Sequence, residues 1–186
     1  MSKNFYLACL DLTGRRCVVV GGGAVGLEKA QGLLECEARV VVVSPELCDG
    51  FEAVGVEWVA RDYRREDLEG AFLVIAATSD RSVNERVSRD AEERGLLCNV
   101  ADVPDLCNFI LPAVHREGSI AVAVSTGGAS PALAKRLRSQ VAELVRPEHS
   151  ELAEELRALR PEVKERFPTY EERRDYFEAL VTERLA

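Results

Sequence analysis

The chain has 186 residues, of which 47% are hydrophobic and 30% are charged, and its formal net charge is −8. This acidic balance argues against a general nucleic-acid-binding protein, because such proteins need a basic surface to contact phosphates. No apolar run reaches the roughly 18 residues that a membrane-spanning helix requires, so we expect no membrane partner. The length predicts one large domain with a smaller region beside it.

The N-terminal part of the sequence predicts a β-α-β unit. A short β-branched run, Cys17–Val20, is followed by glycines in G-x-G-x-x-G spacing, a helical pattern and a second apolar run, Val40–Val43. The motif glycines are Gly21, Gly23 and Gly26. In that order they permit a tight turn, close approach of the backbone to a pyrophosphate, and close packing of the helix on the sheet. We therefore predict a dinucleotide site, the alternative being a glycine turn that only joins strand to helix.

The turn after the second strand bears on the choice of cofactor. NAD sites place an acid about 20 residues after the glycines, where it binds the ribose 2′-hydroxyl. Glu46 stands at about that distance, after Ser44 and Pro45, and no Lys or Arg follows until Arg61 to neutralise a 2′-phosphate. We therefore predict NAD rather than NADP. Alternatively, Ser44 caps a helix whose first residue is Pro45.

Three further strands are predicted, at Val56–Ala60, Phe72–Ala77 and Leu96–Val100. A polar turn that begins with Thr78 follows the second of them, at the edge where open α/β sheets bind ligands. A capping box from Ser82 to Glu85 predicts the start of a helix between the last two strands. The alternation of strands and helices indicates an α/β fold, a Rossmann-type doubly wound parallel sheet.

Asp102 lies just beyond the predicted fifth strand and is the candidate catalytic residue. A carboxylate at this edge can accept a proton while a hydride leaves a substrate. From spacing alone, the alternative is a turn aspartate that precedes Pro104. The histidines, His115 in a polar turn and His149 before a helix, are interpreted as surface residues.

The pattern changes after Asp102. Two short strands, Phe109–Leu111 and Ile120–Val124, are predicted around the polar turn, and Ser130 caps a helix that runs from Pro131 to Val145. The chain is helical from about residue 150, and Pro161 breaks or restarts this helix.

Two groups of residues in this region are candidates for binding an acidic ligand. Ser125, Thr126 and Gly127 could bind an anion through backbone N–H groups, or they could form a plain strand-to-helix turn. Lys135, Arg136 and Arg138 could face an acidic ligand, although a solvated helix face is the alternative.

The sequence contains six cysteines, with no C-x-x-C pair and no His/Cys cluster of metal-ligand spacing. We therefore expect no metal site. The cysteines are interpreted as small buried apolar residues, as in a protein of the reducing cytoplasm.

Four segments in this order resemble the siroheme-synthase dehydrogenase/ferrochelatase module: VVVGGGAVGLEKA, LVIAATSDRSVNERV, CNVADVPDLCNFILPA and AVAVSTGGASPALAKRLR. The resemblance covers about the first 145 residues, and the helical tail is similar but less specific. It implies NAD-dependent oxidation of precorrin-2 to sirohydrochlorin in siroheme biosynthesis, with Asp102 as the catalytic aspartate of an NVxD motif. The implied cofactor contacts are the glycine turn with Ala24 and Val25, and the residues Ser44, Pro45 and Glu46.

The resemblance also implies a homodimer with a helical region exchanged between subunits. The predicted domains are accordingly residues 1–112 for NAD binding, 113–147 for dimerisation and substrate, and 148–186 for a C-terminal helical region. Because the substrate carries many carboxylates, we expect a local basic patch, which we assign to Arg116, Lys135, Arg136 and Arg138. Thr126 stands where some fused siroheme synthases carry a phosphorylated serine, so the resemblance does not carry that regulation over to this chain.

Two other functions stay open at this point. One is a bifunctional enzyme in which the same aspartate also helps insert a metal into sirohydrochlorin. The other is a regulatory NAD-sensing module, which shares the β-α-β unit but needs no catalytic carboxylate.

Overall fold

The computed structural model describes residues 5–185 of the chain. It forms two compact units, one that ends at Leu111 and one that begins at Pro112. The elements of the first unit are β1 (Arg16–Val20), α1 (Ala24–Leu34), β2 (Arg39–Val43), β3 (Glu57–Val59), β4 (Leu73–Ala76), α2 (Arg81–Glu93) and β5 (Leu97–Val100), with short 3-10 helices η1 (Phe51–Ala53), η2 (Arg65–Leu68) and η3 (Pro104–Leu106). The division of the second unit into residues 113–147 and 148–186 stays a prediction.

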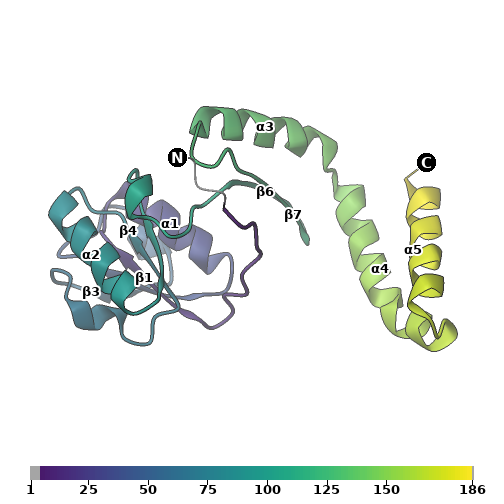
Figure 1. Cartoon of the computed structure of the whole chain (residues 1–186), viewed down its shortest axis with the longest axis horizontal. Coiled ribbons are helices and arrows are strands. Elements are labelled where there is room, and N and C mark those ends of the chain that lie inside the picture. The colour runs from purple at the N-terminus through teal and green to yellow at the C-terminus, as the bar shows by residue number, and fades with distance from the viewer. Residues whose placement is uncertain (1–4, 186) are drawn as a thin grey trace. The chain divides into compact units, whose positions relative to one another are not determined.

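The first unit is built on a five-stranded parallel sheet of order β3-β2-β1-β4-β5 (Figure 1). The order reverses between β2-β1 and β1-β4, which makes a topological switch point beside β1. Because all strands run the same way, the turns that leave their carboxyl ends meet at a single edge. The predicted Rossmann-type α/β fold is confirmed.

Both faces of the sheet are buried, and each has its own core. On one face, Val19 packs with Ala30 and other side chains of α1. On the other face, Val18 and Val20 pack with Val87 of α2. Successive strand residues point to opposite faces, so an unbroken run of β-branched residues supplies both cores at once.

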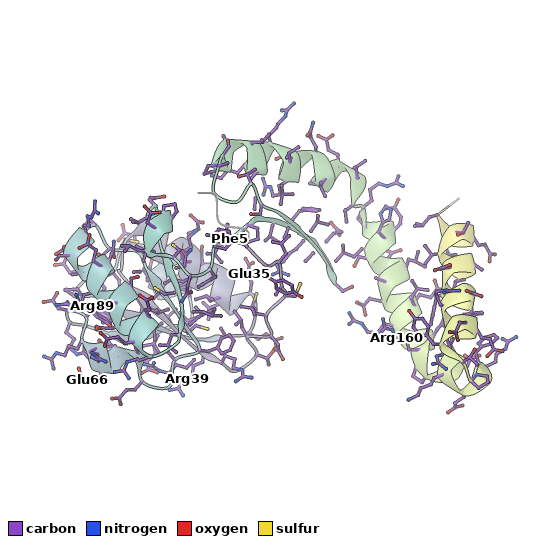
Figure 2. All side chains as sticks on the ribbon, in the orientation of Figure 1. Phe5, Glu35, Arg39, Glu66, Arg89 and Arg160 are labelled. Carbon is purple, nitrogen blue, oxygen red and sulfur yellow. The ribbon has the colours of Figure 1, made fainter. Side chains whose placement is uncertain are left out.

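In this unit charged side chains lie at the surface and two cysteine side chains lie in the interior. The charged side chains of Arg39, Glu66 and Arg89 lie on its outside (Figure 2). The thiols of Cys17 and Cys98 lie inside, where burial raises the pKa of Cys17 to about 11 and that of Cys98 to about 12. These two cysteines are therefore the small buried apolar residues that the sequence predicts.

Helix α2 begins two residues earlier than the capping box predicts, because its N-cap is Asp80 and not Ser82. The Asp80 carboxylate accepts hydrogen bonds from the Ser82 N–H at 2.8 Å and the Val83 N–H at 3.4 Å. The Ser82 hydroxyl also donates to Asp80, at 2.7 Å, so it is not free to cap the helix itself. The prediction of Ser82 as the cap is wrong because a charged carboxylate is the stronger acceptor at a helix N-terminus.

The second unit consists of β6 (Ala113–Glu117), β7 (Ile120–Val124), α3 (Pro131–Leu144), α4 (Pro147–Arg166) and α5 (Tyr170–Arg184). The two strands form an antiparallel hairpin on which α3 packs, and α4 and α5 lie side by side (Figure 1). No helix among residues 5–185 combines the length and the apolar character that crossing a membrane requires.

Two predictions for this unit are wrong. The first hairpin strand begins at Ala113, not at Phe109, so His115 lies within the strand and the turn contains Gly118 in a left-handed conformation, with φ of +54°. Helix α4 continues through Pro161, although this exposed proline lacks the N–H of an intrahelical hydrogen bond and its ring disfavours the preceding turn. The predicted cap of α3 is confirmed, because the Ser130 hydroxyl accepts a hydrogen bond from the Leu133 N–H at 3.2 Å.

Candidate functional site

The turns after β1, β2, β4 and β5 are tied together by backbone hydrogen bonds at the carboxyl edge of the sheet. The Gly21 N–H donates to the Val43 carbonyl at 3.0 Å, and the Cys48 N–H donates to the Gly22 carbonyl at 2.7 Å. On the other side of β1, the Ala77 N–H donates to the Val20 carbonyl at 2.8 Å. The glycine turn is therefore held from both neighbouring strands.

Three glycines of this turn have no room for a side chain. Gly21 has a φ of +121°, and a Cβ there would lie 2.6 Å from the Ala77 carbonyl oxygen. A Cβ on Gly22 would collide with the Glu46 carbonyl oxygen, and one on Gly26 would collide with that of Gly21. Backbone, not a flexible side chain, occupies each of these spaces, so a larger residue would displace the turn.

Gly23 is different, because no heavy atom lies within 4 Å of the place where its Cβ would be. It is the N-cap of α1 and makes no side-chain capping bond, and the first turn of the helix holds no acidic residue. The first N–H groups of the helix, which include those of Ala24 and Val25, therefore have no side-chain acceptor at the cap. This bare helix N-terminus fits the pyrophosphate of a dinucleotide.

After β2 the next helix is η1, which begins at Phe51, so the alternative interpretation of Ser44 as a helix cap is wrong. Ser44 is buried, and its carbonyl accepts a hydrogen bond from the indole N–H of Trp58 at 2.9 Å. Pro45 and Glu46 are exposed beside it. The Glu46 side chain is thus exposed in the turn that leaves β2.

Arg61, the first cation after this turn, is already engaged. Its guanidinium donates to both carboxylate oxygens of Asp67, at 2.8 Å and 2.6 Å. Burial alone would raise the pKa of Asp67, but the bonds from Arg61 and from the Arg64 N–H hold that pKa below its usual range. Arg61 therefore balances a buried carboxylate and is not available to a 2′-phosphate.

Thr78 is fixed by a buried partner. Its hydroxyl donates to the Asn84 amide oxygen at 2.9 Å, and the Asn84 amide donates back to the Thr78 carbonyl at 2.9 Å. The Thr78 backbone nitrogen would lie 3.0 Å from a Cβ on Gly21. Asn84 therefore positions this turn against the glycine turn.

Asp102 occupies an unusual backbone conformation. Its φ is +60°, and among residues 5–185 the only other non-glycine residue with a positive φ is Glu37, which follows α1. This conformation costs a non-glycine residue about 1 to 2 kcal/mol, and such residues concentrate at active sites. The side chain is exposed at the carboxyl end of β5. A turn residue at this position also adopts a positive φ, so the conformation alone does not separate the two interpretations of Asp102.

The anion-binding candidates of the second unit are partly engaged with one another. The Thr126 hydroxyl accepts from the Ser130 N–H at 3.0 Å and lies 3.1 Å from the Ser130 carbonyl oxygen. The Gly127 N–H donates to the Ser125 hydroxyl at 3.2 Å. These groups stabilise the loop before α3, which favours the plain turn over an anion site.

The proposed basic patch is spread over two elements. Lys135 and Arg136 are exposed on α3, and Arg116 is exposed on β6. Exposure alternates along β6, so Arg116 lies on the opposite face of the hairpin from His115. Arg138, the fourth residue of the expected patch, is half-buried on α3.

The two histidines have different environments. His149 is half-buried and accepts a hydrogen bond from the Arg146 N–H at 3.0 Å, which caps α4. His115 is half-buried in β6, and its Nε2 atom is enclosed without a hydrogen-bond partner among the described residues. The prediction of His115 as a surface residue in a turn is wrong.

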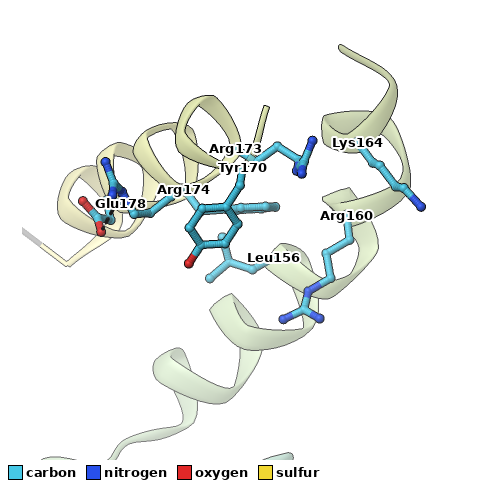
Figure 3. Close-up of a pocket in the computed structure, with 8 residues that line it drawn as sticks. Leu156, Arg160, Lys164, Tyr170, Arg173, Arg174 and Glu178 are labelled. Carbon is cyan, nitrogen blue, oxygen red and sulfur yellow. Dashed lines mark ion pairs between the residues drawn. The ribbon is translucent and has the colours of Figure 1, made fainter. Parts of the chain in front are cut away.

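A separate groove of about 560 Å³ lies between α4 and α5 (Figure 3). Its lining residues are Leu156, Arg160, Lys164, Tyr170, Arg173, Arg174, Phe177 and Glu178. None of the sheet-edge residues lines it. Two of its cations are engaged locally, since Arg173 donates to the Phe167 carbonyl and Arg174 to the Asp175 carboxylate.

Sequence reasoning missed Gly22, Trp58 and Asn84. Gly22 had a visible signal, because three consecutive glycines exceed what the motif requires. Trp58 and Asn84 had no such signal in the sequence, since each donates a hydrogen bond to a turn from a different element.

Family models match three parts of the chain. One described as putative NAD(P)-binding covers residues 8–113. One described as sirohaem biosynthesis protein central covers 117–144, and one described as sirohaem synthase dimerisation region covers 148–186. The resemblance inferred from the four sequence segments is confirmed.

Similar proteins and a similar solved structure agree with these family matches. The siroheme synthases of Thioalkalivibrio sulfidiphilus and Nitrosomonas eutropha are 41% and 37% identical, each over 96% of this chain. The chain spans only 37% and 38% of their respective lengths. The solved structure of SirC, a precorrin-2 dehydrogenase, is 26% identical with a TM-score of 0.79, over 98% of this chain and 93% of that one.

Replacing Gly22 by Ala should abolish dinucleotide binding, because the new methyl group collides with the Glu46 backbone and shifts the turn. We expect the dissociation constant for NAD⁺ in isothermal titration calorimetry to rise at least about a hundredfold, because a shift of about 1 Å in a precisely built site can have an effect of that size.

Gly32→Ala is the matched control. Gly32 lies within α1, and a Cβ there meets no atom within 4 Å. This variant should keep wild-type affinity and gain up to about 1 kcal/mol of stability from helix propensity. Equal affinities of Gly22→Ala and Gly32→Ala would contradict the packing argument.

Proposed function

We propose a function for this chain on the basis of its family. The chain belongs to the family described as putative NAD(P)-binding, whose model covers residues 8–113. The proposed activity is that of a precorrin-2 dehydrogenase, which oxidises precorrin-2 to sirohydrochlorin with NAD⁺. The name of the SirC structure and those of the siroheme synthases support this assignment.

One observation carries the proposal further than the resemblance does. The bare glycine turn after β1 and the left-handed Asp102 after β5 lie at the same edge of one sheet. A dinucleotide that rests its pyrophosphate on the glycine turn extends along this edge. The carboxylate of Asp102 is then on the nicotinamide side of the switch point.

Asp102 supplies the acid–base part of the reaction. When bound, NAD⁺ supplies the acceptor for one hydride. Loss of a hydride alone would leave the tetrapyrrole with a positive charge, so one proton must also leave to complete the new double bond. The exposed Asp102 carboxylate accepts this proton and releases it to water before the next turnover.

NAD is the proposed cofactor in preference to NADP. Glu46 would accept a hydrogen bond from a ribose 2′-hydroxyl and would repel a 2′-phosphate. Arg61, the nearest later cation in the sequence, is paired with Asp67. The remaining proposed cofactor contacts are the helix N-terminus, Ser44, Pro45 and the backbone of Thr78.

The match to a dimerisation region supports a homodimer. We propose that the dimer binds substrate carboxylates through the side chains of Arg116, Lys135 and Arg136. The loop residues Ser125, Thr126 and Gly127 are the other proposed substrate contacts. The cytoplasm remains the proposed location, in keeping with six cysteines that form no disulfide.

Asp102→Asn should lose turnover while keeping NAD⁺ affinity. Asparagine tolerates the left-handed conformation, so this variant removes the charge without disturbing the turn. We expect kcat to fall at least about a hundredfold, as for a lost general base, when NADH absorbance is followed with precorrin-2.

Asp105→Asn is the control, because Asp105 is an exposed acid three residues further along the chain. It should match the wild-type rate. A wild-type protein that binds NAD⁺ but never reduces it would favour the sensor, and NAD-independent insertion of Fe²⁺ into sirohydrochlorin would add the metal-inserting activity.

Glu46→Gln should weaken the discrimination against NADP⁺. Removal of a like-charge repulsion of about 1 kcal/mol should lower the ratio of kcat/KM values for NAD⁺ and NADP⁺ by about fivefold to tenfold. Glu35→Gln, at the far end of α1, serves as the control and should leave the ratio unchanged. An equal ratio in Glu46→Gln and wild type would assign the choice to another residue.

The double charge reversal Lys135→Glu with Arg136→Glu should raise the KM for precorrin-2 with little change in kcat. Loss of two charge-assisted contacts predicts an increase of at least about tenfold. Arg89→Glu with Arg157→Glu changes the net charge equally at other exposed positions. A similar rise in KM in both doubles would indicate a general charge effect and remove these residues from the site.

A further inference from the structure

Among residues 5–185 no strand pairs with the outer edge of β5, and the chain that follows β5 satisfies its backbone groups instead. The Asn108 side chain accepts from the Cys98 N–H at 2.7 Å, and the Asn108 N–H donates to the Cys98 carbonyl at 3.0 Å. The Asn99 side chain donates to the Phe109 carbonyl at 3.1 Å. The segment around residue 108 is therefore fixed against β5.

This anchoring places the Cys107 sulfur under the turn that carries Asp102. The thiol is 5% exposed, and its Sγ accepts from the Val100 N–H at 3.1 Å. The same sulfur lies 3.3 Å from the Val100 carbonyl oxygen and 3.4 Å from that of Val103, so its S–H can donate to either. One side chain thus contacts both ends of the turn.

The turn itself needs such support. It is closed by a hydrogen bond of 3.2 Å from the Val103 N–H to the Val100 carbonyl, and Asp102 is its third residue. A positive φ at this position favours Gly or Asn, and a strained residue persists only where its surroundings determine the backbone. On the β4 side, the Ala101 N–H donates to the Ala76 carbonyl at 2.9 Å. Cys107 is the corresponding contact on the outer side.

We propose that Cys107 is a positioning residue for Asp102: its buried thiol bridges Val100 and Val103 and so fixes the direction in which the carboxylate leaves the sheet edge. The role rests on the proposed dehydrogenase function, in which Asp102 must meet the proton that leaves the substrate. Cys107 itself touches neither substrate nor cofactor in this scheme.

The test compares Cys107→Ala with Cys98→Ala. Both remove a buried thiol at β5 or beside it, but only the first removes contacts to the Asp102 turn. For Cys107→Ala we expect kcat to fall about tenfold to a hundredfold, while the KM for precorrin-2 and the affinity for NAD⁺ stay near wild type. Cys98→Ala should lose thermal stability without this selective loss of kcat.

Two further measurements separate positioning from general damage. Cys107→Ser keeps a group that can accept from the Val100 N–H and donate to a carbonyl, so it should recover part of the lost kcat. Hydrogen exchange followed by mass spectrometry should show faster exchange at residues 100–103 in Cys107→Ala, with residues 17–20 of β1 unchanged. If Cys107→Ala does not fold, Cys107→Ser carries the test through its reduced kcat and its exchange at 100–103.

The proposal is overturned if Cys107→Ala keeps the wild-type kcat, or if exchange at residues 100–103 is unaltered. It is also overturned if kcat, KM and NAD⁺ affinity all worsen together as in a loosened fold. These failures concern Cys107 alone and require an active wild type. A wild-type protein that does not reduce NAD⁺ with precorrin-2 would instead remove the proposed function and, with it, this role.

Discussion

The site depends on the contact of one backbone with another where side chains are excluded. Gly22 lies against the Glu46 carbonyl, Gly26 lies against the carbonyl of Gly21, and Gly21 lies against Ala77. These contacts bring the turns after β1, β2 and β4 together, and they leave Gly23 open on the remaining side. The absence of Cβ atoms therefore both closes the edge of the sheet and exposes the N–H groups that a pyrophosphate needs.

The sequence predicted this region well because its information is local. A β-branched run, a glycine motif and a helical pattern are adjacent in the chain, and each restricts the next. Trp58 and Asn84 were not predictable in the same way, since their hydrogen bonds to Ser44 and Thr78 join residues 14 and 6 positions apart across different elements. Gly22 lies between these cases. The extra glycine was visible in the sequence, but the contact that excludes a side chain there is with the carbonyl of Glu46, 24 residues later.

The second unit was predicted less accurately, for physical reasons. Its hairpin has only two strands, and alternation of half-buried with exposed residues gives a weak signal, so β6 was placed too early. A proline usually ends a helix, because it lacks an N–H and its ring clashes with the preceding turn at a cost of about 3 kcal/mol, yet α4 continues through Pro161. Helix α5 buries no residue within this chain. Elements that find so little core of their own are poorly specified by local pattern, which agrees with a region that matches a dimerisation model.

Asp102 combines a backbone conformation that costs stability with a carboxylate that the turn itself does not need. Glycine would adopt a φ of +60° without strain and would satisfy the turn, so the fold has no need of a carboxylate there. An aspartate tolerates the conformation better than most residues, but it still costs stability. The strain is offset by contacts on both sides, from Ala76 on β4 and from the Cys107 sulfur beyond β5. An exposed carboxylate at the carboxyl edge of the sheet, on a backbone that is held from both sides, is what the proposed role of Asp102 as proton acceptor requires.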